Sequence, residues 1–234
     1  MRAIILAGGR GSRLGKLTES RPKPLVEVSG KPILEHLIRN ALEAGIREYW
    51  VNVGYLGHMI KEYFENGSRF GVNIHYFESV GKGPEQPLFT LREYLGKGTF
   101  YCFCGDNILI PSQIEKIIKF HLQMSADATF TLEQGEPKTV KRVRVKRNKI
   151  LGSSTNMSDP VLVYNMAMQK AFLDVLYETV KDREEKAFAF AMDDLADRYD
   201  TYALNIPFIN INRYGDIQNA EIMLVGADKN EQRC

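Results

Sequence analysis

Residues 2–15 read RAIILAGGRGSRLG, and this stretch decides the fold. Its first part, residues 2–6, is short, apolar and rich in isoleucine and leucine, which is typical of a buried β-strand. Four glycines follow, at positions 8, 9, 11 and 15. Glycines that directly follow a strand leave backbone N–H groups uncovered, so the main chain can approach a phosphate group or the edge of a base. The stretch therefore predicts a ligand-binding turn at the end of a first strand.

Two well-known phosphate-binding loops do not fit this turn. The spacing G-x-x-x-x-G-K-[ST] of a Walker loop is absent. Gly9 and Gly11 match the first two positions of a dinucleotide-binding fingerprint, but Leu14 takes the third. Neither Glu27 nor Glu35 is placed like the ribose-binding acid that ends the second strand of such a fold. A dinucleotide-dependent oxidoreductase is therefore disfavoured, because only the strand and its glycines support it.

Outward from this stretch, short apolar runs alternate with amphipathic segments. No helix is expected directly after the glycines, because Pro22 and Pro24 follow closely. A helix with Pro32 near its start and Gly45 just after its end is typical of a well-bounded amphipathic helix. The predicted strands in this first part are residues 2–6, 48–53, 72–77, 99–104 and 128–132, and the predicted helices are residues 32–44, 57–64, 88–95 and 111–124.

The second half is less regular in its patterning. A hairpin is expected around Arg147 and Asn148, and two strands are expected to join near Pro207. The expected elements are, in order, strands at 140–145 and 149–151, an apolar run at 161–164, helices at about 168–180 and 187–199, two strands within 202–211, and a last helix at about 216–225.

Strands that alternate with helices of these lengths indicate βαβ units. We therefore expect an α/β fold with a Rossmann-like, mainly parallel sheet, helices on both of its faces, and a small α+β lid. All 234 residues are expected to form a single domain, with residues 133–234 supplying the lid and the closing elements. In open α/β sheets, ligands bind at the carboxyl edge of the strands. The loops at 7–15 and 105–110 both follow strands at that edge, so we expect them to meet.

Charge and hydropathy disfavour two classes of partner. The formal net charge is +2, from 31 basic and 29 acidic residues, which gives no case for nucleic-acid binding. The basic run at 138–149 is interleaved with valines and is interpreted as a solvated strand face. No apolar run approaches the roughly 20 residues that cross a bilayer. Neither nucleic acid nor a membrane is therefore an expected partner.

The three cysteines indicate a reducing environment. Cys102, Cys104 and Cys234 have neither the spacing of a disulfide framework nor that of a zinc site. Cys102 and Cys104 lie two residues apart within an apolar run, so we expect both to be buried core thiols on one face of a strand. A cytoplasmic location follows as an expectation.

The segment LAGGRGSRL at 6–14, followed by PKPL at 22–25, resembles the signature of the sugar-1-phosphate nucleotidylyltransferases. That family includes glucose-1-phosphate thymidylyltransferases and mannose-1-phosphate guanylyltransferases. The resemblance continues through 26–33 and at Gly105-Asp106-Asn107, and it returns at 208–220, so it covers a little over half of the chain. It implies the nucleotide-diphospho-sugar transferase type of α/β fold, with a nucleotide-binding half at 1–132 and an acceptor-binding lid at 133–234.

The resemblance also implies a role for individual residues. Arg13 would bind the triphosphate and stabilise the leaving pyrophosphate, and Lys23 would contact the α-phosphate and the acceptor phosphate. Asp106 would hold Mg²⁺, so that these three residues are the implied catalytic set. The implied nucleotide-binding residues, of which 6–9 would line the base and ribose, are Leu6, Ala7, Gly8, Gly9, Gly11, Ser12, Arg13, Lys23 and Gly105.

The chemistry of such a transfer asks for the same residue types. A sugar 1-phosphate is already an anionic nucleophile, so no general base is required for it to take a nucleoside monophosphate group from a nucleoside triphosphate. The difficulty is to bring two polyanions together, and cations with a metal ion solve it by positioning and charge neutralisation. Mg²⁺ prefers one or two oxygen ligands from the protein together with substrate phosphates. Asp106, at the carboxyl end of a predicted strand, suits that role.

A second metal ligand is expected within NINRYGDI, at 210–217. Family members often carry an aspartate in a pattern like D-I-G-T-P-E-D-L, and related uridyltransferases use asparagine instead. Asn210 matches the aspartate by its distance to Asp216, and Asn212 matches the asparagine form. Either amide oxygen could complete the site, and the alternative is that one or both asparagines cap the last helix.

Two departures from the family pattern leave the base and the acceptor open. The segment expected beside the base, P-x-G-x-A-x-A, reads GPEQPLF at 83–89, with Gln86 at a different offset. A Glu-Lys pair expected in the sugar pocket is missing from 152–160, and Lys146 or Lys149 could replace it.

Three functional hypotheses therefore stay open, with transfer to a sugar 1-phosphate as the leading one. The second is transfer to a non-sugar phosphate monoester such as phosphocholine or a polyol phosphate. The third is a non-catalytic regulatory protein that binds nucleotide sugars, which Arg13, Lys23 and Asp106 disfavour because a sensor does not need them. The hexapeptide repeats of a C-terminal β-helix are absent, so acyl transfer is not expected, and a homo-oligomer stays open.

Overall fold

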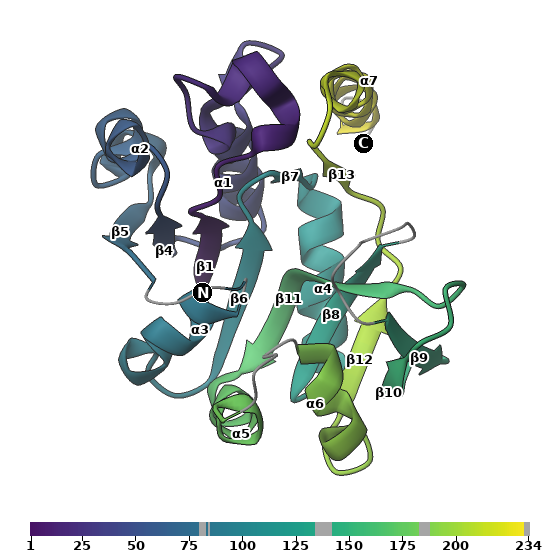
Figure 1. Cartoon of the computed structure of the whole chain (residues 1–234). Helices are drawn as coiled ribbons and strands as arrows, with labels where there is room; N and C mark the ends of the chain where they lie inside the picture. The colour runs from purple at the N-terminus through teal and green to yellow at the C-terminus, as the bar shows by residue number, and fades with distance from the viewer. Residues whose placement is uncertain (80–82, 84, 134–141, 183–187, 232–234) are drawn as a thin grey trace. The chain divides into compact units, whose positions relative to one another are not determined.

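The computed structural model describes residues 1–79, 83, 85–133, 142–182 and 188–231 (Figure 1). Contacts divide the chain into two compact units. Unit 1 comprises Met1–Glu78, Phe103–Glu115 and Pro207–Cys234, and unit 2 comprises Ser79–Cys102 and Lys116–Ile206. Each unit is thus assembled from segments that are distant in the sequence.

Parallel strands form the centre of unit 1. Strands β1 (Arg2–Ala7), β4 (Glu48–Val53) and β5 (Asn73–Phe77) lie side by side in the order β5-β4-β1 (Figure 1). Ile4 and Ile5 point to opposite faces of β1, and both are fully buried. A strand buried on both faces needs continuous rather than alternating apolar residues, which explains the run at the start of the chain. The expected parallel α/β arrangement is confirmed in this unit.

Two helices connect these strands, α1 (Ile33–Glu43) and α2 (Gly57–Phe64). Helix α1 begins directly after Pro32, and Gly45 follows its end with a φ of 90°. This is the arrangement that the positions of the proline and the glycine predict. The face of α1 that is buried carries Ile33, Leu34, Leu37, Ile38 and Ala41.

Short elements complete unit 1, and several of them carry the residues of the candidate site. They are the 3-10 helices η1 (Ser12–Thr18), η2 (Lys23–Leu25) and η3 (Ser68–Phe70), the hairpin of β2 (Glu27–Val28) with β3 (Lys31–Pro32), the ribbon of β7 (Asn107–Ile108) with β13 (Ile209–Asn210), and the last helix α7 (Tyr214–Glu231).

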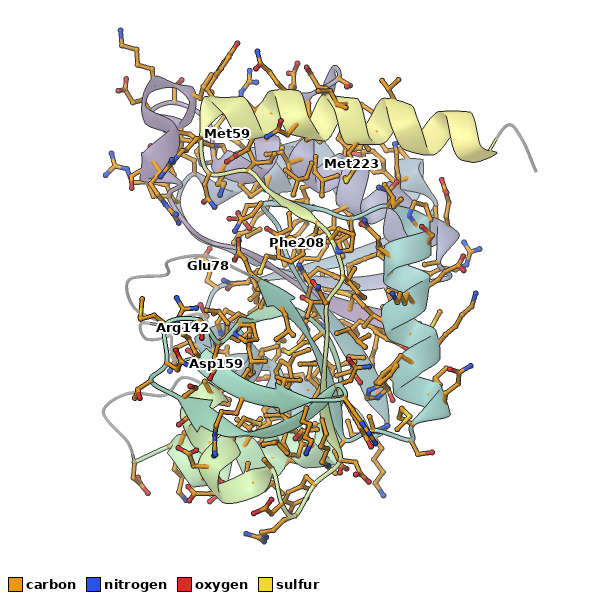
Figure 2. All side chains as sticks on the ribbon, turned by 90° about the vertical axis from the view of Figure 1, so that its right-hand side faces the viewer. Met59, Glu78, Arg142, Asp159, Phe208 and Met223 are labelled. Carbon is orange, nitrogen blue, oxygen red and sulfur yellow. The ribbon has the colours of Figure 1, made fainter. Side chains whose placement is uncertain are left out.

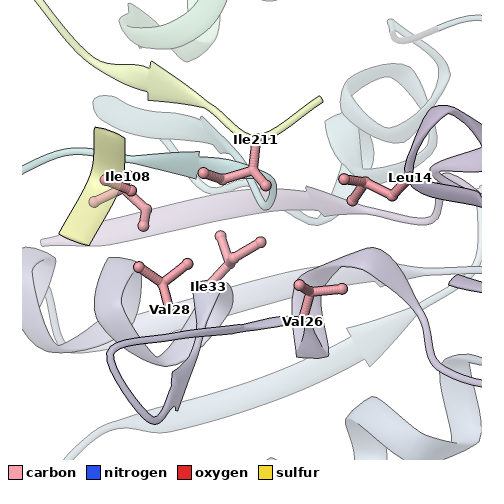
Figure 3. Close-up of a cluster of buried hydrophobic side chains, with 7 residues drawn as sticks. Leu14, Val26, Val28, Ile33, Ile108 and Ile211 are labelled. Atoms are coloured by element: carbon pink, nitrogen blue, oxygen red, sulfur yellow. The ribbon is translucent and has the colours of Figure 1, made fainter. Parts of the chain in front are cut away.

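A cluster of buried apolar side chains joins these short elements (Figure 3). Ile108 and Ile211 meet side chains from the first part of the chain there (Figure 3). Met223 of α7 packs against the same cluster. Burial of this apolar surface therefore holds three distant segments of the sequence together. The buried members are Leu14, Val26, Val28, Ile33, Ile108, Ile211 and Ala220.

Unit 2 has a mixed sheet in which most strand pairs are antiparallel. Its order is β6-β11-β8-β12-β10-β9, and β12 with β8 is its parallel pair. The strands are β6 (Thr99–Cys104, whose last two residues belong to unit 1), β8 (Ala128–Glu133), β9 (Arg142–Lys146), β10 (Lys149–Ser154), β11 (Val161–Gln169) and β12 (Thr201–Leu204).

The helices of unit 2 are α3 (Gln86–Leu91), η4 (Arg92–Tyr94), α5 (Lys170–Val180) and α6 (Phe188–Leu195), while α4 (Pro111–Gln123) starts in unit 1 and ends in unit 2. Arg142 at the start of β9 donates a hydrogen bond to the backbone carbonyl of Asp159 over 2.5 Å (Figure 2). This bond ties the loop before β11 to the neighbouring strand.

The hairpin expected around Arg147 and Asn148 is confirmed. β9 and β10 pair antiparallel, and the two turn residues have φ values of 49° and 68°. Positive φ at both central residues is the geometry of a tight hairpin turn. Val140 and the first part of the basic run at 138–149 lie outside the described residues.

Three expectations about local structure were wrong. The helix placed from Met168 begins only at Lys170, because Met166, Ala167 and Met168 continue β11 between β6 and β8 and are fully buried there. The stretch after the glycines does form a helix, the 3-10 helix η1. Cys102 is fully buried, whereas Cys104 is only partly buried.

The assignment of residues 1–132 to a nucleotide-binding half and of 133–234 to a lid stays a prediction. Within the described part of the chain, no helix combines the length and the apolar character needed to cross a bilayer.

Candidate active site

The loops that follow β1 and β6 are brought together in unit 1. The backbone N–H of Gly105 donates to the carbonyl of Leu6 over 2.9 Å. A Cβ at Gly105 would lie 3.1 Å from Ala7 Cβ and 3.1 Å from the Leu6 carbonyl oxygen. Glycine therefore allows the main chain of one strand end to lie directly against the other.

Gly11 makes room for Lys23. Its φ is 67°, in the left-handed region, and a Cβ there would lie 2.7 Å from the Cβ of Lys23. The carbonyl of Gly11 accepts hydrogen bonds from the N–H of Leu14 over 3.0 Å and from the hydroxyl of Thr18 over 3.1 Å. Gly11 thus both starts η1 and places the stem of Lys23 against the glycine loop.

The Lys23 side chain is held by its local backbone and is nearly buried. Pro22 and Pro24 flank it, and its residue is 6% exposed. The N–H of Val26 donates to the carbonyl of Lys23 over 3.0 Å, which closes the short helix η2. Proline on both sides restricts the backbone, so the position of the lysine stem is well defined.

The Lys23 ammonium lies between two side-chain oxygens. Its Nζ donates to Asp106 Oδ2 over 2.6 Å and to Asn212 Oδ1 over 3.2 Å. Residues separated by most of the length of the chain therefore converge on one cation. Two oxygens that converge on an ammonium can also converge on a metal ion.

The ribbon of β7 with β13 delivers these two oxygens. Asp106 directly precedes β7 and Asn212 follows β13, and the N–H of Ile211 donates to the carbonyl of Asp106 over 3.0 Å. The N–H groups of Asn212 and Arg213 both donate to Asp216 Oδ2, over 2.7 Å and 2.7 Å. Asp216 thus fixes the backbone at the start of α7, and the Asn212 side chain is directed to Lys23.

Asn210 has a different position from Asn212. It lies opposite Asn107 in the ribbon, where the two side chains share one face. Its buried Oδ1 has no hydrogen-bond partner among the described residues, and the same holds for the amide of Asn107. The structure therefore groups Asn212, rather than Asn210, with Lys23 and Asp106.

A cavity of about 220 Å³ lies at this point of unit 1. Most of the residues expected at the site line it, together with Pro24, which the expectation did not include. Gly8, Ser12, Gly105 and Asn210 are not part of the lining. The lining residues are Leu6, Ala7, Gly9, Gly11, Arg13, Lys23, Pro24, Asp106 and Asn212.

Gly8 serves the loop that follows β4. Its carbonyl accepts the N–H of Tyr55 over 3.2 Å, and a Cβ at Gly54 would lie 2.6 Å from the Gly8 oxygen. This close approach holds the glycine loop against the loop that follows β4.

Arg13 differs from Lys23 in its surroundings. It lies on η1, is exposed, and lines the cavity. Among the described residues it makes no hydrogen bond or ion pair with another side chain. Its guanidinium is thus available for a ligand with several phosphate oxygens.

His36 ties two elements of unit 1 together. Its Nε2–H donates to the carbonyl of Val28 over 2.7 Å, which ties α1 to the β2–β3 hairpin. Burial lowers the pKa of His36, so the imidazole stays neutral near pH 7. The charged side chains that line the cavity, as the structure describes it, are those of Arg13, Lys23 and Asp106.

Asp216 and Pro24 are the residues that sequence reasoning missed. An aspartate in the first turn of a helix signals a partner for exposed N–H groups, so Asp216 could have been found. The contact of Pro24 with the cavity depends on how η2 turns, which the sequence pattern does not give.

Comparison with known proteins identifies relatives of this chain. A family model described as nucleotidyl transferase matches residues 2–140. A UTP–glucose-1-phosphate uridylyltransferase from Synechocystis is 36% identical over 141 residues, which cover 55% of this chain and 36% of that relative. The uridylyltransferase AglF from Haloferax volcanii is 36% identical over 135 residues, which cover 57% of this chain and 54% of AglF. The chain therefore spans about half, or less, of the length of these curated relatives.

A solved structure supports the fold over nearly the whole chain. UDP-glucose pyrophosphorylase complexed with UDP-glucose is similar with a TM-score of 0.77, covering 97% of this chain and 98% of that one. At 16% sequence identity, this likeness establishes the fold class. It is the α/β architecture with a central sheet that the sequence predicts.

Proposed function

The chain belongs to the nucleotidyl transferase family, and from that premise we propose that it transfers a nucleoside monophosphate group from a nucleoside triphosphate to a sugar 1-phosphate. The observation that carries the proposal is the convergence of Arg13, Lys23, Asp106 and Asn212 on one cavity beside a glycine loop. The products would be a nucleoside diphosphate sugar and pyrophosphate. The names of the two uridylyltransferase relatives make UTP and glucose 1-phosphate the first pair to test.

The reaction is an in-line displacement at the α-phosphorus. An oxygen of the acceptor phosphate attacks that phosphorus, and the bond to the oxygen that bridges the α- and β-phosphates breaks. The electron pair leaves with pyrophosphate. The acceptor oxygen is already deprotonated near neutral pH, so no side chain has to remove a proton. Catalysis then depends on positioning and on neutralising charge.

Two cationic side chains of the cavity suit this task. The exposed guanidinium of Arg13 would bind the β- and γ-phosphates and stabilise the leaving pyrophosphate. The ammonium of Lys23 would contact the α-phosphate and the acceptor phosphate. Backbone N–H groups of Gly9 and Gly11, which line the cavity, would approach the nucleotide.

The oxygens of Asp106 and Asn212 fit a magnesium ion. Both are hard ligands, and both already lie within hydrogen-bond distance of a single cation, Lys23 Nζ. Asn210 fits less well, because it does not line the cavity. When bound, Mg²⁺ would neutralise phosphate charge and hold the triphosphate in a defined geometry.

The test is pyrophosphate release from purified protein with Mg²⁺. Each of five common nucleoside triphosphates is combined with a panel of acceptors that includes hexose 1-phosphates, phosphocholine and a polyol phosphate. Asp106→Asn keeps the shape of the side chain and should abolish release. Glu62→Gln is the matched control, because Glu62 is a carboxylate of unit 1 outside the cavity, and it should retain full activity.

Each outcome assigns a function. Release that needs one triphosphate and one hexose 1-phosphate supports the proposal. Pyrophosphate release with phosphocholine or a polyol phosphate instead would show that the acceptor is a non-sugar phosphate monoester. No release with any pair, together with tight binding of a nucleotide sugar by calorimetry, would contradict catalysis and indicate a regulatory protein.

A further inference from the structure

The two oxygens that suit a metal ion are both engaged by Lys23. Its Nζ lies 2.6 Å from Asp106 Oδ2 and 3.2 Å from Asn212 Oδ1. The Lys23 side chain is 7% exposed, whereas that of Asp106 is 33% exposed. The ammonium is therefore more buried than its partner and depends on these oxygens for its hydrogen bonds.

The protein offers few other ligands for a metal at this place. Across the described ranges, no group of three or more His, Cys, Asp and Glu side chains could hold a metal ion. Among the described residues that line the cavity, Asp106 is the single carboxylate, so a metal ion would lack ligands without phosphate oxygens. It would also have to share the Asp106 carboxylate with an ammonium. Two cations that close to each other repel strongly, most of all where water is partly excluded.

Lys23 can leave these oxygens by moving only its flexible end. The stem is fixed, because Gly11 lies against its Cβ and prolines flank the backbone. Beyond the Cβ, the side chain has rotatable bonds that can redirect Nζ. An ammonium that leaves a carboxylate needs a new acceptor, and a polyphosphate in the same cavity would supply one.

We propose that Lys23 Nζ occupies the metal position in the nucleotide-free protein and vacates it when the triphosphate arrives. The metal site is thus closed by an internal cation, and the metal binds together with the nucleotide rather than before it. This inference rests on the proposed function, because it takes the cavity as the place where a triphosphate and a metal ion meet. The coupling is reciprocal, so the nucleotide raises the affinity for the metal and the metal raises the affinity for the nucleotide.

The inference is tested by the affinity for Mn²⁺ in the absence of nucleotide. Mn²⁺ replaces Mg²⁺ as the probe, and free Mn²⁺ is measured by electron paramagnetic resonance on the full chain. Lys23→Met removes the ammonium and keeps the length of the side chain. It should bind Mn²⁺ at least about tenfold more tightly than the wild type, because the two oxygens are released.

Arg13→Met is the matched control. It removes one positive charge from the same cavity, but among the described residues Arg13 makes no hydrogen bond or ion pair with Asp106 or Asn212. The general change in potential should alter the Mn²⁺ affinity by less than about threefold. A gain in Arg13→Met as large as that in Lys23→Met would overturn the inference, because the effect would then be one of net charge.

Further outcomes separate this inference from the proposed function. Equal Mn²⁺ affinities for wild type and Lys23→Met, with weak binding by Asp106→Asn, would contradict the inference that Lys23 occupies the metal position. The role of Asp106 as a metal ligand would still be supported. Absence of Mn²⁺ binding in every protein, with or without nucleotide, would remove both the inference and the role of the metal. Lys23→Gln provides a second variant if Lys23→Met has no cooperative thermal unfolding transition.

Discussion

Gly11 and Lys23 lie so close that a Cβ on the glycine would be 2.7 Å from the Cβ of the lysine. The same glycine has a φ of 67°, a conformation that a residue with a side chain adopts only at a cost. The position of the Lys23 ammonium thus depends on the absence of a side chain at Gly11. The close approach and the positive φ both constrain Gly11, so its replacement should lower both the stability and the activity of the protein.

Gly11→Ala should lower the free energy of unfolding by about 1–3 kcal/mol, because it adds backbone strain and a steric clash. It should also reduce pyrophosphate release, since the Lys23 stem must shift. Thermal or urea unfolding measures the first effect. Gly9→Ala is the control for stability alone, because a Cβ there meets nothing within 4 Å. Equal stabilities of the two variants would contradict this account of the loop.

Arg13→Met should separate activity from stability. Arg13 is exposed and makes no hydrogen bond or ion pair within the described part of the chain, so unfolding should change by less than about 0.5 kcal/mol. Loss of the cation that we propose to stabilise the leaving pyrophosphate should lower kcat/KM by about 100-fold. Steady-state kinetics beside a melting curve provide the measurement. A large fall in the melting temperature with normal kinetics would assign Arg13 a structural role instead.

Asp216→Ala should lower activity although Asp216 does not line the cavity. It removes the acceptor for two backbone N–H groups, those of Asn212 and Arg213, and should cost about 1 kcal/mol of stability. The freed backbone should also let Asn212 move away from Lys23 and lower activity. Asp216→Asn keeps an oxygen at the same position and should behave much more like the wild type. If both variants lose activity equally, the carboxylate charge matters rather than the hydrogen bonds.

His121 should make unit 2 sensitive to mild acid. It is buried, and its ring nitrogens face the hydroxyls of Thr99 and Thr129. Burial lowers the pKa of His121 to about 4, from 6.5. Between these values the unfolded chain binds a proton that the folded protein does not bind. The free energy of unfolding should therefore fall as the pH is lowered from 6.5 to 4, by about 3 kcal/mol at most.

Urea unfolding at pH 7.5 and at pH 4.5 checks this effect, with His121→Gln as the control. Carboxylates and His36 titrate in both proteins, so their contributions cancel in the comparison. The wild type should lose more stability than the variant over this interval. An identical loss in both proteins would show that His121 is not the group that responds.

The sequence predicted the central elements of the fold because their patterns are local. The buried run of β1, the proline and glycine around α1, and the turn at Arg147 and Asn148 each follow from short-range chemistry. The end of β11 was missed, because Met166 and Met168 suit a helix by propensity and become a strand only through pairing with two neighbours. Helix η1 was missed because a 3-10 helix has neither the length nor the period of an amphipathic α-helix.

The sequence likewise predicted some features of the candidate site and not others. Lys23 and Asp106 were identified from motif residues, as was the region that contains Asn212. Their common contact could not be predicted, because it depends on the geometry of η2 and of a two-residue ribbon. Which of Asn210 and Asn212 lies beside Lys23 could be seen only in the structure, since both satisfy the spacing of the pattern.

The division of the chain into interleaved units has a consequence for its synthesis. Unit 1 receives its last segment only after all of unit 2 has been translated, and Asn212 lies in that segment. A chain that is still on the ribosome already contains β1 and the glycine loop. Until residue 212 has been translated, it lacks Asn212, which is one of the two side chains that accept a hydrogen bond from Lys23. The order of translation therefore delays assembly of the cavity lining until the segment that carries Asn212 has been made.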